Sequence, residues 1–127
     1  MKQRLLSFVQ AFIMLAALSY AAAAEERAMS TIHVYLADGF EDDEILARVD
    51  GQEVYAKTAV TTMRLTSLAD EFSFDAGGDR TLLEIELPAE MLATTIEIDP
   101  VRGRYIAVSV EDGRLTHFVS ATPLGFH

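Results

Sequence analysis

The chain has 127 residues, half of them hydrophobic, no cysteine, and 20 acidic against 10 basic residues. That length has room for one domain, and so much apolar material excludes a disordered acidic chain. Without cysteine the chain can hold no disulfide, thiolate zinc site or iron–sulfur cluster. The negative charge repels the phosphates of nucleic acids, so nucleic acid is excluded as a partner.

The pattern of residues 1–24 predicts a signal peptide. Lys2 and Arg4 precede an apolar run, and four alanines lead up to the expected cleavage site after Ala24. The alternative is an uncleaved membrane anchor, since the apolar run and the alanines together are just long enough to span. Lys2 and Arg4 are the only charged residues of this leader, so residues 25–127 keep 8 basic and 20 acidic residues, a net charge of −12. We expect these residues to form a single exported domain, periplasmic or secreted, with no membrane attachment after cleavage.

Apolar residues recur at every second position in most of the domain, which is typical of half-buried β-strands. Eight such segments, with turn residues between them, cover 32–36, 45–49, 54–60, 72–74, 83–87, 96–98, 106–110 and 115–119. One segment, 88–92, has room for a single helical turn. We therefore predict an all-β domain, an antiparallel β-sandwich of seven or eight strands that is immunoglobulin-like or similar, with a barrel as the alternative.

Two Asp-Gly pairs predict two-residue hairpins of type I′. The first, Asp50-Gly51, predicts two opposite-charge pairs on one face and apolar pairs on the other. The complete register is Val49 with Gln52, Arg48 with Glu53, Ala47 with Val54, Leu46 with Tyr55, Ile45 with Ala56, and Glu44 with Lys57.

The second pair, Asp112-Gly113, predicts that His117 lies opposite Val108 on the apolar face. We interpret His117 as a neutral, hydrogen-bonded histidine at the edge of the core, with a ligand or base as the alternative. A three-residue loop with a bulge would instead turn it to the outside. The neighbouring pairs in the predicted register are Val110 with Leu115 and Ile106 with Val119.

The segments 40–44, 49–55, 68–70 and 123–126 (FEDDE, VDGQEVY, LAD and PLGF) together resemble a family of small, uncharacterised, secreted bacterial β-sandwich domains. The resemblance covers most of residues 31–126. It implies a β-sandwich fold and implies no activity or catalytic residue.

A dense acidic loop joins the first two predicted strands. Calcium is bound by six to eight oxygen ligands from a flexible loop, and this loop could supply several of them, although its spacing is not that of an EF-hand. The alternative is a solvated turn that keeps a sheet edge soluble. The candidate calcium ligands are Asp38, Glu41, Asp42, Asp43 and Glu44.

If the first three strands form a meander, aromatic and basic side chains share its outer face and form a candidate binding surface. The alternative is that a second sheet or another subunit packs on this face. No serine lies in a nucleophile elbow, and we expect neither an enzyme nor a cofactor other than calcium. The residues of this predicted surface are His33, Tyr35, Leu46, Arg48, Tyr55 and Lys57.

These observations favour a non-catalytic interaction or structural domain of the bacterial cell envelope, which meets a protein partner or a second copy of itself. The alternative is a calcium- or carbohydrate-binding module that uses the acidic loop and nearby aromatic rings. A small hydrolase is a third hypothesis.

Overall fold

The computed structural model describes residues 29–77 and 80–126, so the predicted leader lies outside the described residues. Within them, all eight predicted strands and the single helical turn, a 3-10 helix, are confirmed. No described helix is long and apolar enough to cross a membrane. The elements are β1 (Ser30–Leu36), β2 (Asp43–Val49), β3 (Gln52–Val60), β4 (Asp70–Ala76), β5 (Thr81–Leu87), η1 (Pro88–Glu90), β6 (Leu92–Ile98), β7 (Tyr105–Glu111) and β8 (Arg114–Ser120).

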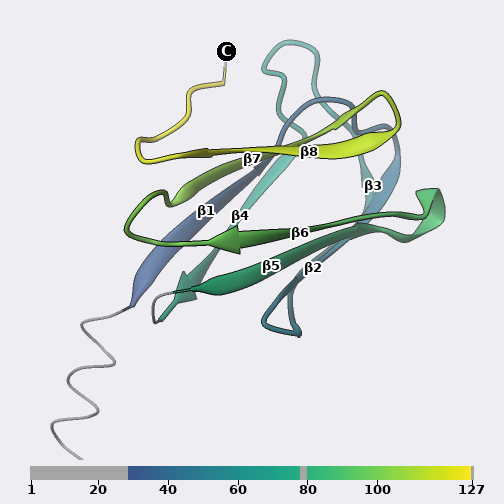
Figure 1. Ribbon diagram of the computed structural model, residues 1–127. Helices are drawn as coiled ribbons and strands as arrows, with labels where there is room; N and C mark the ends of the chain where they lie inside the picture. Colours follow the sequence, from purple (N-terminus) through teal and green to yellow (C-terminus); the bar gives the residue numbers. More distant parts are fainter. Residues whose placement is uncertain (1–28, 78–79, 127) are drawn as a thin grey trace, which may run out of the picture.

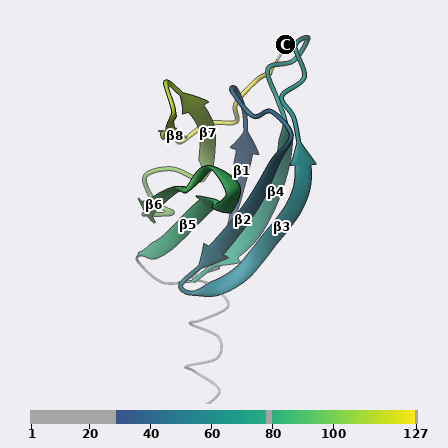
Figure 2. The same ribbon diagram turned by 90° about the vertical axis from the view of Figure 1, so that its right-hand side faces the viewer.

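The strands form two four-stranded sheets that pack face to face, which confirms the predicted sandwich (Figure 1). Sheet A has the order β4-β1-β7-β8, and Figure 2 shows its strands side by side in that order. Sheet B has the order β3-β2-β5-β6. All pairings are antiparallel except that of β1 with β7, which is parallel. The chain therefore crosses between sheets after β1, β3, β4 and β6, while the other strands follow their predecessors in hairpins.

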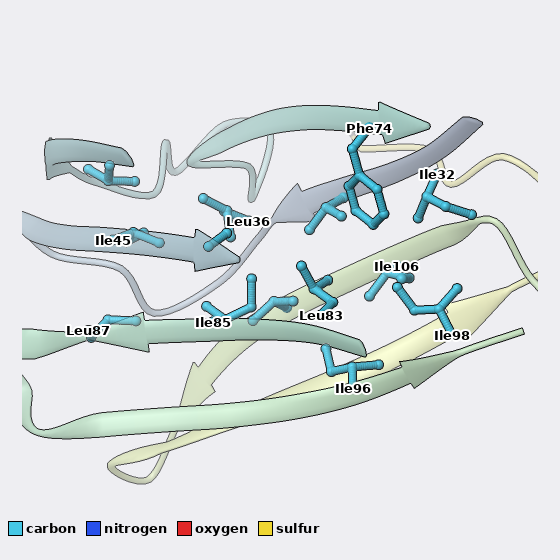
Figure 3. Close-up of a cluster of buried hydrophobic side chains, with 14 of the residues drawn as sticks. Ile32, Leu36, Ile45, Phe74, Leu83, Ile85, Leu87, Ile96, Ile98 and Ile106 are labelled. Atoms are coloured by element: carbon cyan, nitrogen blue, oxygen red, sulfur yellow. The ribbon is translucent and has the colours of Figure 1, made fainter. Parts of the chain in front are cut away.

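The core lies between the sheets and follows from the alternation of the sequence. Alternate residues along most of β1, β5 and β7 are buried, and Ile32, Ile85 and Ile106 have no exposed surface. Figure 3 shows their side chains converging from both sheets. Full burial of one such side chain stabilises the fold by about 1.5–3 kcal/mol, so this layer is the main source of stability.

Both predicted Asp-Gly turns are present, with the two turn residues of each at positive φ as type I′ requires. The register of the second hairpin is confirmed throughout, including Val108 opposite His117. The first hairpin follows the predicted register only next to the turn, where Val49 lies opposite Gln52 and Arg48 opposite Glu53.

Farther from that turn the predicted register is wrong because β3 contains two extra residues. The register shifts by one residue at Val54, so Tyr55 rather than Val54 lies opposite Ala47, and it shifts again near Ala59, whose φ is 56°. The remaining observed pairs are Leu46 with Ala56, Ile45 with Lys57, and Asp43 with Val60. Bulges of this kind are common in edge strands, and the first turns Tyr55 and Lys57 toward the other sheet. The predicted pairing of Glu44 with Lys57 is therefore wrong.

Candidate functional site

The predicted binding surface does not exist as one surface, because the first three strands do not form a meander. β1 lies in sheet A, whereas β2 and β3 lie in sheet B. The six predicted residues therefore lie in three places. His33 and Tyr35 are on the outer face of sheet A, Leu46 and Arg48 are on the outer face of sheet B, and Tyr55 and Lys57 face the gap between the edges of the two sheets.

At that gap Tyr55 and Lys57 form a polar cluster with Asp70 of β4. The Tyr55 hydroxyl and the Lys57 ammonium donate hydrogen bonds to the same carboxylate oxygen, Asp70 Oδ2, at 2.7 and 3.1 Å. The Tyr55 ring stacks on Phe72 with 4.5 Å between ring centroids. Because these contacts join β3 to β4, the cluster closes one open side of the sandwich and is best explained as a structural feature.

The charges of this cluster follow from its contacts. Partial burial and the hydrogen bond to Asp70 raise the pKa of Tyr55. Burial alone would raise the pKa of Asp70, but the hydrogen bonds from Tyr55, from the backbone N–H of Glu71 and from Lys57 lower it below its ordinary value. Near neutral pH the cluster therefore holds an ionised carboxylate beside a protonated phenol.

The acidic loop does not gather its carboxylates. Asp43 is buried, and its Oδ2 accepts a 2.9 Å hydrogen bond from the backbone N–H of Glu41, so it shapes the turn. The side chains of Asp38, Glu41, Asp42 and Glu44 are exposed. Within the described residues, no group of three or more Asp, Glu, His or Cys side chains is placed to hold a metal ion. The predicted calcium ligands therefore do not form a preformed site there.

Threonine hydroxyls at the end of β3 fix the same loop. Thr62 Oγ1 accepts the backbone N–H of Phe40 and donates to the carbonyl of Ala37, at 3.1 and 2.6 Å. Thr61 Oγ1 accepts the N–H of Asp42 at 3.0 Å. A hollow of about 460 Å³ lies between this loop and residues 61–67. Some main-chain groups of the loop beside it are already hydrogen-bonded to the threonine hydroxyls. The hydrogen bonds indicate that the loop is rigidly held.

The most distinctive surface is the outer face of β1, β7 and β8, which we call the aromatic face. Its residues alternate with the buried ones and lie in two rows across the strands, set by the register. One row is His33, Tyr105 and Ser120, and the next is Tyr35, Ala107 and Phe118. Ser109 and Thr116 extend the face toward the β7–β8 turn, where Glu111 and Arg114 end it; the two rows themselves contain no Asp, Glu, Lys or Arg.

Ring contacts organise the aromatic face. His33 stacks on Tyr105 with 5.1 Å between centroids and an interplanar angle of 7°. Phe126, from the segment that follows β8, packs on Tyr35 at 5.1 Å. Phe118 is 61% exposed, an unusual exposure for a phenylalanine in a strand. The face thus offers a pre-ordered aromatic surface with one accessible ring.

Acidic residues border this face along β4. Glu71 lies opposite Tyr35 in the sheet, and Asp75 accepts a hydrogen bond from Thr31 at 2.9 Å. Burial, together with the negative charge of Glu71 and the nearby Tyr105 hydroxyl, raises the pKa of Tyr35. A shallow hollow of about 350 Å³ lies along this border, lined by residues of β1 and β4.

The outer face of sheet B is of the opposite character. Arg48 Nη1 lies 2.9 Å from Glu86 Oε1, and Arg80 Nη1 lies 3.0 Å from Glu97 Oε1. Exposed ion pairs of this kind add little stability, but they keep a sheet face hydrated. This face also carries Glu44, Glu53 and Glu84.

Sequence reasoning identified His33 and Tyr35 but missed Tyr105 and Phe118. Tyr105 comes beside His33 only through the parallel pairing of β1 with β7, two strands far apart in the chain. Phe118 joins this surface only through the pairing of β8 with β7, which places it beside Ala107. His117 lies on the inner side of β8 as predicted, yet it is exposed because β8 is the last strand of its sheet.

Comparisons of the chain with protein-family models, curated proteins and solved structures found no match in any of the three.

Proposed function

We propose that the chain is an exported, non-catalytic interaction domain of the bacterial cell envelope, and that it meets a protein partner through the aromatic face. The observation that carries this proposal is the contrast between the two outer faces. Sheet B presents ion pairs to solvent, whereas the two rows of the aromatic face on sheet A present aromatic and small side chains without a formal charge. On these three strands of sheet A, charged residues are found only at Glu111 and Arg114, next to the β7–β8 turn.

The contrast between the two faces is significant because the domain as a whole is strongly acidic. Two adjacent rows of side chains without a carboxylate stand out on a domain with a net charge of −12 over residues 25–127. Interface cores are depleted in charged residues and enriched in aromatic ones, which describes this face. Ring stacking holds His33 and Tyr105 in place, so little side-chain entropy would be lost when a partner binds.

The border of the face indicates the chemistry of the partner. β4 lines one side with Glu71 and Asp75, which are exposed. A partner with an apolar centre and basic groups along one side would complement both the aromatic face and this acidic border. We therefore expect binding to weaken as salt concentration rises, with part of the affinity retained in high salt through apolar contacts.

Site-specific photocrosslinking in the producing cell tests the proposal. A photoreactive phenylalanine analogue would replace Phe118 or Tyr105, and Leu82, a 46% exposed residue of the outer face of sheet B, serves as the matched control position. We expect adducts with an envelope protein from positions 118 and 105 and none from position 82. Equal yields from all three positions, or no adduct from 118 and 105, would contradict the proposal.

The exported location is tested separately, since it depends on residues 1–24. Sequencing the amino terminus of the protein recovered from its native cell should begin at Glu25 or one residue away. An amino terminus at Met1 in the cytosolic fraction would contradict export.

A further inference from the structure

We propose that β8 pairs antiparallel with β8 of a second copy of this chain about a two-fold axis. The two copies of sheet A would then join into one sheet of eight strands. This inference goes beyond the proposed function, because it concerns the edge of sheet A rather than its outer face.

β8 is an edge strand of sheet A. The register of β8 with β7 is unbroken over all seven residues of each strand. The two-residue turn makes Glu111 and Arg114 a hydrogen-bonded pair, so every second residue of β8 from Arg114 onward directs its main-chain groups toward β7. The main-chain N–H and C=O groups of Leu115, His117 and Val119 therefore point away from the sheet. In the described part of the chain, no strand is hydrogen-bonded to that side of β8, although β6 of the other sheet approaches it.

The other edge strands of the two sheets, β3, β4 and β6, differ from β8. Natural edge strands avoid unwanted pairing by bulges, charges or proline. β3 has two bulges, β4 carries Asp70, Glu71 and Asp75, and β6 carries Glu97. β8 has no bulge, no proline and no acidic residue, and its one charged residue, Arg114, lies next to the turn.

The side chains of β8 support the same conclusion. Phe118 and Val119 are 61% and 39% exposed, one on each face of the strand. Pairing with another strand would cover part of both. An unbulged edge with exposed apolar side chains promotes association between chains when it is left open, so we infer that another strand covers it.

A second copy is the occupant that fits these conditions best. A strand added here must itself lack carboxylates, or it would bring further negative charge to an acidic domain. β8 meets this condition, and every copy of the chain carries it. In the joined sheet the two acidic β4 strands would lie at opposite far ends, which minimises repulsion between the copies.

The register of β8 with β8 of the second copy follows from one condition. The residues whose main-chain groups point away from β7 must pair with each other. With the two-fold axis at His117, this residue lies opposite His117 of the second copy. Leu115 then lies opposite Val119 of the second copy, and each such pair exchanges both main-chain hydrogen bonds. On the outer side Phe118 would face Thr116 of the second copy, so the two aromatic faces would become continuous.

Sedimentation equilibrium with a matched pair of variants tests this inference. His117→Pro removes an outward N–H and leaves the pairing with β7 intact, whereas His117→Ala keeps the N–H and removes the ring. We expect the unmodified protein and His117→Ala to dimerise alike. His117→Pro should raise the dissociation constant of the dimer at least tenfold while its circular dichroism spectrum is unchanged. A monomer at every concentration, or a dimer that is unaffected by His117→Pro, would overturn the inference.

A thiol crosslink keeps the test valid even if His117→Pro fails to fold. Since the chain contains no cysteine, a single introduced thiol can link only two copies. We expect a short bifunctional thiol reagent to crosslink His117→Cys efficiently and Thr95→Cys, an exposed position of edge strand β6, only at background level. Equal yields from the two variants would overturn the inference.

The two proposals fail separately. A monomeric protein that still yields an envelope-protein adduct from position 118 would overturn the β8 pairing and support the proposed function. A dimer whose only adduct from position 118 is a second copy of the chain would support the β8 pairing and contradict an envelope partner at the aromatic face.

Discussion

The hydroxyl of Tyr55, in the edge strand of one sheet, donates a 2.7 Å hydrogen bond to Oδ2 of Asp70, in the edge strand of the other sheet. Lys57 donates to the same oxygen, and the Tyr55 ring packs on Phe72. The bulge at Val54 makes these contacts available, because without it Tyr55 would point to the outer face. One inserted residue thus converts a surface tyrosine into a link between the two sheets.

Replacing Tyr55 with phenylalanine should lower the free energy of unfolding by about 1–2 kcal/mol, since the ring contact remains and a hydrogen bond to a charged acceptor is lost. Urea denaturation measures this change. Tyr105→Phe is the control, because the Tyr105 hydroxyl has no hydrogen bond within the described residues. A change of similar size in both variants would contradict the role of the Tyr55–Asp70 bond.

The same bond predicts a pH dependence with two limits. Folding lowers the pKa of Asp70. The stability that its carboxylate contributes is therefore present above the ordinary pKa of about 4 and is lost as the pH falls through the lowered pKa. Folding raises the pKa of Tyr55. The stability that its hydroxyl contributes is therefore present below about pH 10 and is lost as the pH rises toward the raised pKa.

The stability difference between the unmodified protein and Tyr55→Phe should therefore be constant between about pH 4 and pH 10 and should shrink on either side. Urea unfolding at pH 3, 7 and 10.5 gives the three required points. A difference that is largest at pH 3 would show that the ionised Asp70 carboxylate is not the acceptor.

Glycine 39, in the acidic loop, should be far less tolerant of substitution than Gly51, in the first hairpin. Both have positive φ, 87° and 85°, so alanine at either position is strained by about 1–2 kcal/mol. A Cβ at Gly39 would also overlap the carbonyl oxygen of Val110, whereas a Cβ at Gly51 meets nothing within 4 Å. We expect Gly39→Ala to cost at least about 2 kcal/mol more than Gly51→Ala. Thermal unfolding of both variants checks this, and equal losses would contradict the close approach of this loop to β7.

The strands were predictable because their signal is local. Alternating burial and the two Asp-Gly turns depend on residues that are adjacent in the chain. Both turns and the entire register of the second hairpin could therefore be predicted from the sequence. The register of the first hairpin failed at Val54 because small or polar residues lie on both faces of β3. From the sequence, Val54, Ala56 and Thr58 could face the core as well as Tyr55 and Lys57 could. The alternation of residues does not show where the extra residue of the bulge lies.

The candidate site was only partly predictable because it depends on which strands share a sheet. The sequence favours pairing neighbours along the chain, which would place β1 beside β2. The structure instead pairs β1 with β4 and β7, which removes Leu46 and Arg48 from the surface around His33 and brings Tyr105 into it. Local alternation identifies which residues point outward, but it does not show which outward residues are neighbours.

The parallel pairing of β1 with β7 assembles the aromatic face, so the contact between His33 and Tyr105 tests the account most directly. Solution NMR of the protein should give nuclear Overhauser effects between the ring protons of these two residues, whose centroids lie 5.1 Å apart. The account predicts these effects together with none between His33 and Leu46. Their absence, with effects from His33 to Leu46 instead, would place β1 beside β2 and would contradict the aromatic face and the proposed function that depends on it.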